Sequence, residues 1–375
     1  MANDAEVPHT PRSDHAQALL DWFAQHRRQL PWRNQPSPYA VLVSELMLQQ
    51  TRVETVIDYF SRWMARWPTV GDLAQASQSD VLAMWTGLGY YNRARNLHAA
   101  AQTVMARHAG VMPSDDAALR ALPGVGPYTV GAVRSIAFGQ PAALVDGNVA
   151  RVLARWTAFA GDPGQPKGRQ AIWEIAEAWL SEPLPRAHPG AWNEALMELG
   201  ATVCTPRSPR CPQCPVSGQC LARAQGREQV IPPVRQKTPP QLVRAAYAVI
   251  VGENEMQDGV ADPEPFVLLG RRPENVRWAG LWEPPGVEGM DSLDVLNARL
   301  RAEGLTPGVP FGPIVHILTH RRYEVLAVPV RCPVDGVPLL PAFGYAELRF
   351  QAISHALGKE SGLSRLAQKL LAVVV

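Results

Sequence analysis

Two acidic residues stand in settings that suit them to acid–base chemistry. Glu45 lies in the apolar stretch VLVSELMLQQT, with Leu42 and Leu48 on its own helical face. A carboxyl group there either points to solvent or sits in an apolar pocket, where a raised pKa makes it a general acid. Asp146 opens the segment DGNVARVLAR beside Asn148, a polar helix start that we expect to keep it ionised. One neutral and one anionic carboxyl suit cleavage of a glycosidic bond through an oxocarbenium-like state, although Asp146 could equally be a plain helix N-cap.

Four of the five cysteines crowd into the stretch CTPRSPRCPQCPVSGQC with the spacing C-x6-C-x2-C-x5-C. They are Cys204, Cys211, Cys214 and Cys220. Four thiolates suit either zinc or a [4Fe–4S] cluster, but zinc sites usually pair two CxxC knuckles and only one is present. Four unligated thiols are disfavoured because reactive thiols rarely crowd without a ligand. The spacing therefore favours the [4Fe–4S] cluster.

The stretch LPGVGPYTVGAV places Gly124 and Gly126 in a turn that opens into an apolar helix. Backbone N–H groups at such a helix start suit a phosphate oxygen. No strand precedes the turn and no GxxxxGK occurs, so dinucleotide-binding and P-loop sites are excluded. A turn that grips a nucleic-acid backbone without reading its sequence fits better, with tight packing between helices as the plain alternative.

Side chains that could enter a base stack lie in MLQQT and WTGLGYYNRARN, at expected loop or helix edges. These are Gln50, Leu88 and Tyr90. Flipping a base out of a duplex leaves a gap that such side chains can fill. Each of them taken singly could be an ordinary core or surface residue.

The elements that must position these residues divide into two classes. Apolar residues at three- and four-residue spacing dominate residues 15–221 and predict an all-α domain, with a helix-hairpin-helix at 119–138 and a cysteine loop at 204–220. A basic, proline-rich linker is expected at 222–241. Residues 242–375 contain short β-branched segments and two helical ones, which predict an α+β domain. Residues 1–14 are expected to be disordered.

Composition agrees with a multi-domain protein of 375 residues, 46% of them hydrophobic, and the net charge of +2 does not by itself indicate a polyanionic partner. The first residues contain no apolar signal segment, and no run approaches a membrane-spanning length. We therefore expect a cytoplasmic, nucleoid-associated bacterial protein that has no membrane partner.

The ordered motifs LPGVGPYTVG, VDGNV and the cysteine array together resemble the helix-hairpin-helix DNA glycosylases of the endonuclease III type. SELMLQQT, WTGLGYYNRARNL and WNEALMELGATVC narrow the resemblance to the A/G-specific adenine DNA glycosylases, the MutY family. It covers residues 15–221 closely and the remainder more loosely. The resemblance implies a monomeric base excision repair enzyme that removes adenine mispaired with 8-oxoguanine or guanine in double-stranded DNA.

The resemblance also implies roles for single residues. Glu45 would protonate the flipped adenine and handle the attacking water, and Asp146 would stabilise the sugar cation. The adenine pocket would be lined by Arg28, Trp32, Arg33 and Glu194. The residues near the opposite base would be Gln50, Leu88, Gly89 and Tyr90. The remaining DNA contacts would come from Gly124, Gly126 and Asn148.

Tyr128 stands where family members that also cleave the strand carry a Schiff-base lysine. A phenol forms no imine, so the resemblance implies a monofunctional enzyme that leaves an abasic site. A bifunctional enzyme would need another lysine, and Lys167 is the only lysine in the helical domain. A catalytically inactive lesion-binding DNA module is the alternative from a different class, and the presence of both Glu45 and Asp146 argues against it.

The second domain resembles the Nudix-like fold of 8-oxo-dGTP hydrolases, in PFVLLGRRP and WAGLWEPPG. The following segment lacks the clustered glutamates that bind magnesium, so we expect no pyrophosphatase activity and no metal there. The resemblance implies that the domain reads the oxidised guanine. Where the family commonly has Phe-Ser-His on the recognition hairpin, this chain has Leu318, Thr319 and His320. Thr319 keeps a hydroxyl for the lesion, whereas Leu318 lacks the aromatic ring.

Overall fold

The computed structural model describes residues 11, 13–34, 36–233, 239–253, 265–274, 276–333, 343–358 and 362–374. Most of the predicted disordered N-terminus and part of the predicted linker lie outside these ranges. The described residues group into two compact units. The first takes in residues up to 75 and those between 96 and 236, and the second takes in 76–95 and those from 237 onward. The boundaries expected from the sequence, at 221 and 241, remain a prediction.

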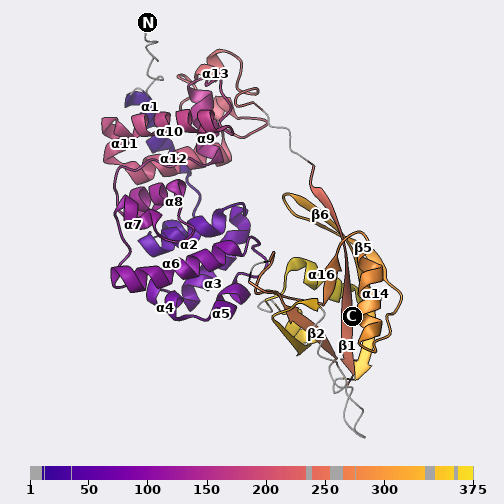
Figure 1. Ribbon diagram of the computed structural model, residues 1–375. Coiled ribbons are helices and arrows are strands. Elements are labelled where there is room, and N and C mark those ends of the chain that lie inside the picture. The colour runs from indigo at the N-terminus through magenta and orange to yellow at the C-terminus, as the bar shows by residue number, and fades with distance from the viewer. Residues whose placement is uncertain are drawn as a thin grey trace. The chain divides into compact units, whose positions relative to one another are not determined.

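The helices that carry the predicted site alternate with short turns, as the breakers in the sequence indicate (Figure 1). They are α1 (Ser13–His26), η1 (Pro31–Arg33), α2 (Pro38–Leu48), α3 (Val53–Arg66), α4 (Val70–Gln75), α5 (Gln78–Met84), α6 (Asn92–His108), α7 (Asp116–Arg120), α8 (Pro127–Ala132), η2 (Val133–Ala137), α9 (Gly147–Trp156), α10 (Pro166–Ser181), α11 (Pro183–Ala187), α12 (Pro189–Thr202), η3 (Cys211–Gln213) and α13 (Leu221–Ala224). The all-α class predicted for this part of the chain is confirmed. No helix among the described residues is long and apolar enough to cross a membrane.

Helix α2 is a core helix, which determines the environment of Glu45. It is buried on all sides from Tyr39 to Met47, so it has no polar face that could present a carboxylate to bulk water. Its start is fixed by Ser37, whose side chain accepts a hydrogen bond from the Ala40 N–H. Helix α3 is instead amphipathic and buries Val56, Phe60 and Trp63 at three- and four-residue spacing.

The predicted helix-hairpin-helix is formed by α7, the turn at 121–126 and α8, and it continues as a π-helical turn, η2. Gly124 adopts φ +77°, and a Cβ there would lie 2.6 Å from the Asn96 Cβ, so both conformation and space require glycine. Gly131 in α8 lies so close to the next segment that a Cβ would meet the Ala143 carbonyl oxygen at 2.0 Å. This close approach brings the segment that leads to Asp146 against the helix that carries Tyr128.

The second unit is built on one mixed sheet, as the α+β prediction requires. Besides α5 and the start of α6, its elements are β1 (Gln241–Glu253), β2 (Phe266–Arg271), β3 (Trp282–Glu283), β4 (Gly286–Glu288), α14 (Ser292–Ala302), β5 (Phe311–Ile317), β6 (Arg321–Pro333), β7 (Glu347–Ala352), α15 (Ile353–Ala356) and α16 (Arg365–Val374). The described strands run in the order β3-β2-β1-β6-β5, with β4 also paired to β1 and β7 to β2. β1 and β6 are parallel, with Gln241 opposite Arg321, and the other described pairs are antiparallel.

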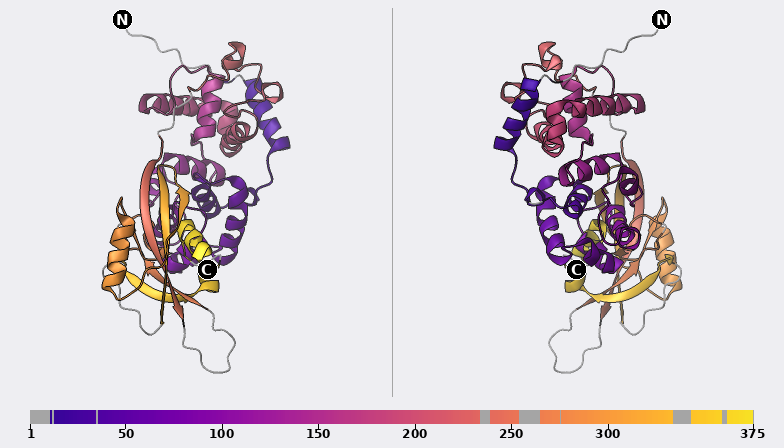
Figure 2. Two further views of the ribbon diagram at one scale, coloured as in Figure 1. Left: turned by 90° about the vertical axis from the view of Figure 1, so that its right-hand side faces the viewer. Right: turned by 90° about the vertical axis from the view of Figure 1, so that its left-hand side faces the viewer.

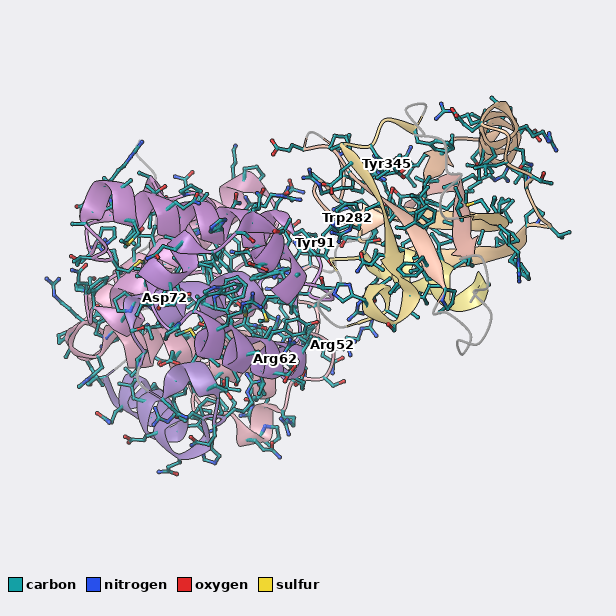
Figure 3. All side chains as sticks on the ribbon, turned by 90° about the horizontal axis from the view of Figure 1, so that it is seen from below. Arg52, Arg62, Asp72, Tyr91, Trp282 and Tyr345 are labelled. Atoms are coloured by element: carbon teal, nitrogen blue, oxygen red, sulfur yellow. The ribbon has the colours of Figure 1, made fainter. Side chains whose placement is uncertain are left out.

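The two faces of this sheet are covered by different helices. Leu296 and Leu300 of α14 join one apolar cluster, and Leu366 and Leu370 of α16 join the other. Figure 1 shows the two helices on opposite sides of β1, and Figure 2 follows them from two further sides. Trp282 of β3, labelled in Figure 3, belongs to the cluster with α16.

Candidate active site

A cavity of about 420 Å³ in the first unit brings together nine of the residues predicted from the sequence. They are Arg28, Trp32, Arg33, Glu45, Gln50, Tyr128, Asp146, Asn148 and Glu194. The hairpin glycines 124 and 126, residues 88–90 and residues 318–320 do not line it. The cavity therefore gathers the predicted catalytic and adenine-pocket residues, while most of the predicted duplex contacts lie elsewhere.

Glu45 is a buried carboxyl group with one strong hydrogen-bond partner. Its side chain is 5% exposed, and its Oε2 accepts a hydrogen bond of 2.6 Å from the Tyr128 hydroxyl. Burial raises the pKa of Glu45 to about 7; the Tyr128 hydrogen bond opposes this rise, and the charge of Asp146 adds to it. Near neutral pH, Glu45 is thus divided between its acid and its base forms, as a group that first donates and later accepts a proton requires.

Asp146 is both a helix cap and a wall of the cavity. It is the N-cap of α9, with its Oδ1 accepting from the Val149 N–H at 2.7 Å and its Oδ2 from the Asn148 amide at 2.9 Å. We expected these polar neighbours to push its pKa opposite to that of Glu45. Instead burial raises the pKa of Asp146, and the hydrogen bonds only oppose the rise. Asp146 is therefore the N-cap that the plain alternative predicts, and it also lines the cavity, while its role in the reaction stays a prediction.

Two arginines of the cavity are held by a glutamate that the sequence reasoning missed. Glu198 is 1% exposed. Its carboxylate accepts hydrogen bonds from Arg28 Nε at 2.7 Å, from Arg28 Nη2 at 3.1 Å and from Arg33 Nη2 at 3.0 Å. Burial would raise the pKa of Glu198, but the hydrogen bonds from Arg28 and the charge of Arg33 outweigh it and hold the pKa low. Arg33 also donates to Glu194 Oε1 at 2.8 Å, yet burial still raises the Glu194 pKa.

The pocket wall between these charges is aromatic. Trp32 is buried and meets the Phe60 ring edge-on at a centroid distance of 5.5 Å. Such a rigid apolar surface beside hydrogen-bonding side chains can hold a flat heteroaromatic ring.

A signal for the role of Glu198 is present in the stretch WNEALMELGATVC. Glu198 lies four residues after Glu194 on α12, and two acidic residues on one helical face indicate that cations lie nearby.

The predicted DNA contacts outside the cavity have different surroundings. Gly126 is the N-cap of α8, no side chain caps it, and no atom lies within 4 Å of a Cβ built there, which leaves room for a close approach. Tyr90 is 45% exposed with φ 49°, whereas Leu88 is only 6% exposed. Gln50, which does line the cavity, is exposed just after α2 and adopts φ 57°.

Leu318, Thr319 and His320 form the turn between β5 and β6. The Leu318 N–H donates to the Arg321 carbonyl oxygen at 2.7 Å, which closes the turn. Leu318 packs against the apolar cluster with α16, while Thr319 and His320 are exposed. Within the second unit, the Thr319 hydroxyl is hydrogen-bonded to that of Tyr90.

The four crowded cysteines line one small cavity and form no disulfide. Burial raises the pKa of Cys214 to about 12 and also raises that of Cys211 and Cys220, so buried thiolates there need a cation. Arg155, which is 2% exposed, donates to the Cys204 sulfur at 3.3 Å. This donor set fits an iron–sulfur cluster held by four thiolates.

A chain of hydrogen bonds joins this loop to the Asp146 carboxyl group. Arg151 donates through Nε to the Cys204 carbonyl oxygen at 2.8 Å and through Nη2 to the Asn148 side chain at 2.9 Å. Asn148 in turn donates to Asp146. The cysteine loop thus helps to orient the start of α9.

Comparison with known proteins gives matches for both regions. Residues 43–178 match the model of the HhH-GPD superfamily base excision DNA repair proteins, and residues 204–220 match the iron–sulfur binding domain of endonuclease III. The adenine DNA glycosylase of Rattus norvegicus is 37% identical and covers 91% of this chain and 76% of its own length. The chain belongs to the adenine DNA glycosylase family. The Homo sapiens member is 38% identical over 86% of this chain and 68% of its own length.

Structural likeness agrees with this family. A thermostable thymine-DNA glycosylase superposes with a TM-score of 0.50 at 31% identity, covering 56% of this chain and 95% of that one. As a family member, the chain is a DNA-binding base excision repair enzyme that hydrolyses N-glycosidic bonds, with a [4Fe–4S] cluster on the four cysteines. Nothing in the comparisons favours the inactive DNA-binding alternative.

Proposed function

We propose that this enzyme removes adenine mispaired with 8-oxoguanine or guanine in duplex DNA, and that it leaves an abasic site without cutting the strand. The observation that carries the proposal is the cavity in which Glu45, with a pKa of about 7, faces Tyr128 and Asp146 beside a wall of arginine, glutamate and tryptophan. The cavity already contains the predicted acid, the predicted stabiliser of the sugar cation and the predicted base-binding residues, so the proposed reaction requires no second copy of the chain and we propose a monomer.

In the proposed reaction, protonated Glu45 donates its proton to the extruded adenine, which makes the base a better leaving group. The C1′–N9 bond then breaks, and its electron pair leaves with the base. The sugar becomes an oxocarbenium ion, which the Asp146 carboxylate stabilises. A water molecule attacks C1′ and loses its proton to the Glu45 carboxylate, which restores the acid. The products are adenine and an abasic sugar.

Base recognition would rest on the charged wall of the cavity. Arg28, Arg33 and Glu194 offer hydrogen-bond donors and an acceptor, and Trp32 offers a flat face for the ring. Because Glu198 fixes both guanidinium groups, their donors are arranged before the base enters. The raised pKa of Glu194 supports a role in which it can be an acceptor or, when protonated, a donor.

Tyr128 is the reason that we assign no strand cleavage. Its hydroxyl is hydrogen-bonded to Glu45 and to the Met197 sulfur, the latter at 3.3 Å, so the position is occupied by a phenol that cannot form an imine. For the opposite base, we assign reading of 8-oxoguanine to the exposed Thr319 hydroxyl in the β5–β6 turn.

The test is a single-turnover assay on duplexes that carry A opposite 8-oxoguanine, G or T, with products read with and without alkali. We expect breaks only after alkali, fastest opposite the lesion. Thr319→Ala should reduce the preference for the lesion over G, while Glu177→Gln, at an exposed position outside this cavity, should behave as wild type. Breaks without alkali would contradict the monofunctional assignment, and a lack of adenine release would contradict the proposal as a whole.

A further inference from the structure

The turn between α5 and α6, residues 85–91, is closed by a buried arginine; we call it the wedge turn. Arg93 is 7% exposed, and its Nη2 donates to the carbonyl oxygens of Leu88 at 3.0 Å and Gly89 at 2.9 Å. The Trp85 indole N–H donates to the same Gly89 carbonyl at 3.1 Å. Buried carbonyl groups need hydrogen-bond partners, and this turn lies outside the helices and strands that would otherwise provide them. The Arg93 and Trp85 side chains provide these hydrogen bonds instead.

The backbone of the wedge turn adopts left-handed conformations that need such support. Gly87 and Gly89 have φ of 98° and 72°, which glycine adopts readily. Tyr90 has φ of 49°, a conformation that a residue with a Cβ adopts only when its surroundings hold it. The Arg93 N–H donates to the Tyr90 carbonyl oxygen at 2.8 Å, and the Gly87 N–H donates to the Tyr91 hydroxyl at 3.4 Å. Tyr91 is labelled in Figure 3.

The Arg93 guanidinium also lies against two aromatic rings. Its central carbon is 5.3 Å from the Trp85 ring centroid and 5.6 Å from that of Tyr90, both within the range of cation–π contacts. Burial lowers the pKa of Arg93 to about 10, so the group remains charged near neutral pH. Tyr90 is thus supported by a buried cation while 45% of it stays exposed.

We infer that Arg93 is a positioning residue for base extrusion, because it holds Tyr90 in the conformation needed to fill the gap that a flipped base leaves. A side chain that is ordered before binding loses less conformational entropy when it enters the stack. The inference rests on the proposed function and on the role that the family resemblance implies for Tyr90, entry into the base stack near the opposite base. Arg93, Leu88 and Gly89 are not among the residues that line the cavity that contains Glu45.

Arg93→Lys tests the inference because lysine keeps the charge but lacks the planar guanidinium group, which donates from Nη2 to two carbonyl groups and lies against two rings. We expect the single-turnover rate on A opposite 8-oxoguanine to fall by about 10- to 100-fold, with duplex affinity changed by less than about 3-fold. On a substrate whose adenine faces an abasic site, and is therefore unpaired and extruded at lower cost, the loss should shrink to less than about 3-fold. Fluorescence of 2-aminopurine beside the target adenine should report slower extrusion.

The matched control is Arg66→Lys, because the Arg66 guanidinium carbon lies 5.1 Å from the Trp67 ring centroid at the end of α3. It should match wild type on every substrate. Tyr90→Leu, which keeps Arg93, should reproduce the duplex-specific loss. The inference is overturned if Arg93→Lys matches wild type on A opposite 8-oxoguanine. It is also overturned if the rate falls equally on the mispaired and the unpaired adenine, because an equal loss indicates general damage to the enzyme. If the wild type releases no adenine, the proposed function fails first and the inference falls with it.

Discussion

Replacing Glu45 with glutamine should abolish turnover and, at the same time, stabilise the protein at alkaline pH. Glu45→Gln removes a carboxyl group whose pKa burial raises from 4.5 to about 7, a difference of 2.5 units. At about 1.4 kcal/mol per unit, ionised Glu45 costs the native state about 3 kcal/mol. Because the folded pKa lies above the unfolded one, the native state binds the proton more tightly. Stability therefore falls as pH rises from about 4.5 to about 7 and is constant above that range.

Glutamine is neutral throughout, so the variant escapes this cost. Its stability gain should be about 1 kcal/mol at about pH 5.5 and about 3 kcal/mol at about pH 8.5, where the wild type has paid the full ionisation penalty. Thermal unfolding should then show a rise of roughly 5 to 10 °C at the higher pH and a smaller rise at the lower one. Affinity for the mismatched duplex should change little, because glutamine has nearly the same shape.

The matched control is Glu177→Gln, which neutralises an exposed carboxylate of α10 and should show no comparable pH-dependent gain. A Glu45→Gln variant with the same stability difference at both pH values would refute the reasoning, because it would mean that Glu45 titrates normally. Retained turnover would refute its role as the acid. For the wild type, kcat/KM should fall about tenfold per pH unit above about pH 7, since only protonated Glu45 can donate.

Three further predictions concern the supports of the site. Tyr128→Phe removes the hydrogen bond that favours ionised Glu45, so the alkaline limb of the pH–rate profile should move up by about one unit; a downward move would contradict this. Gly131→Ala would place a Cβ 2.0 Å from the Ala143 carbonyl oxygen. It should lower the free energy of unfolding by about 1–3 kcal/mol in denaturant titrations. An unchanged unfolding midpoint would show that the segment around Ala143 moves aside without cost. Cys214→Ser should lose the absorbance of the iron–sulfur cluster and lower the melting temperature, whereas full iron content would exclude Cys214 as a ligand.

Local patterns in the sequence predicted most of the elements because their apolar residues are strongly periodic. The short β-branched segments expected in residues 242–375 include β1, β2, β5 and β6, and the two helical segments expected there correspond to α14 and α16. The strands β3 and β4 were not predicted, because a strand of two or three residues is too short to show an alternation of apolar and polar side chains. The grouping of residues 76–95 with the second unit depends on long-range contacts, which no local pattern encodes.

In the site, the identity of Glu45 was predictable because its whole helix is apolar, which implies burial. The direction of the Asp146 pKa was not, because the sequence shows polar neighbours but not how little water reaches the side chain. Glu198 was missed because its role depends on Arg28 and Arg33, which are more than 160 residues away along the chain, at separations of 170 and 165. Residue types and spacing thus indicated the chemistry, whereas the electrostatic balance needed the three-dimensional arrangement.

Asp146 carries one further consequence, for how natural variation at this position is interpreted. The carboxylate that would face the sugar cation also holds the first turn of α9, so most substitutions would injure folding and chemistry together. Asparagine is the exception, because it caps helices about as well as aspartate but carries no charge. A chain with asparagine at 146 should therefore accumulate in the cell as a folded, duplex-binding protein that repairs nothing. Such a protein would occupy mispairs and shield them from other repair, a worse outcome than its absence.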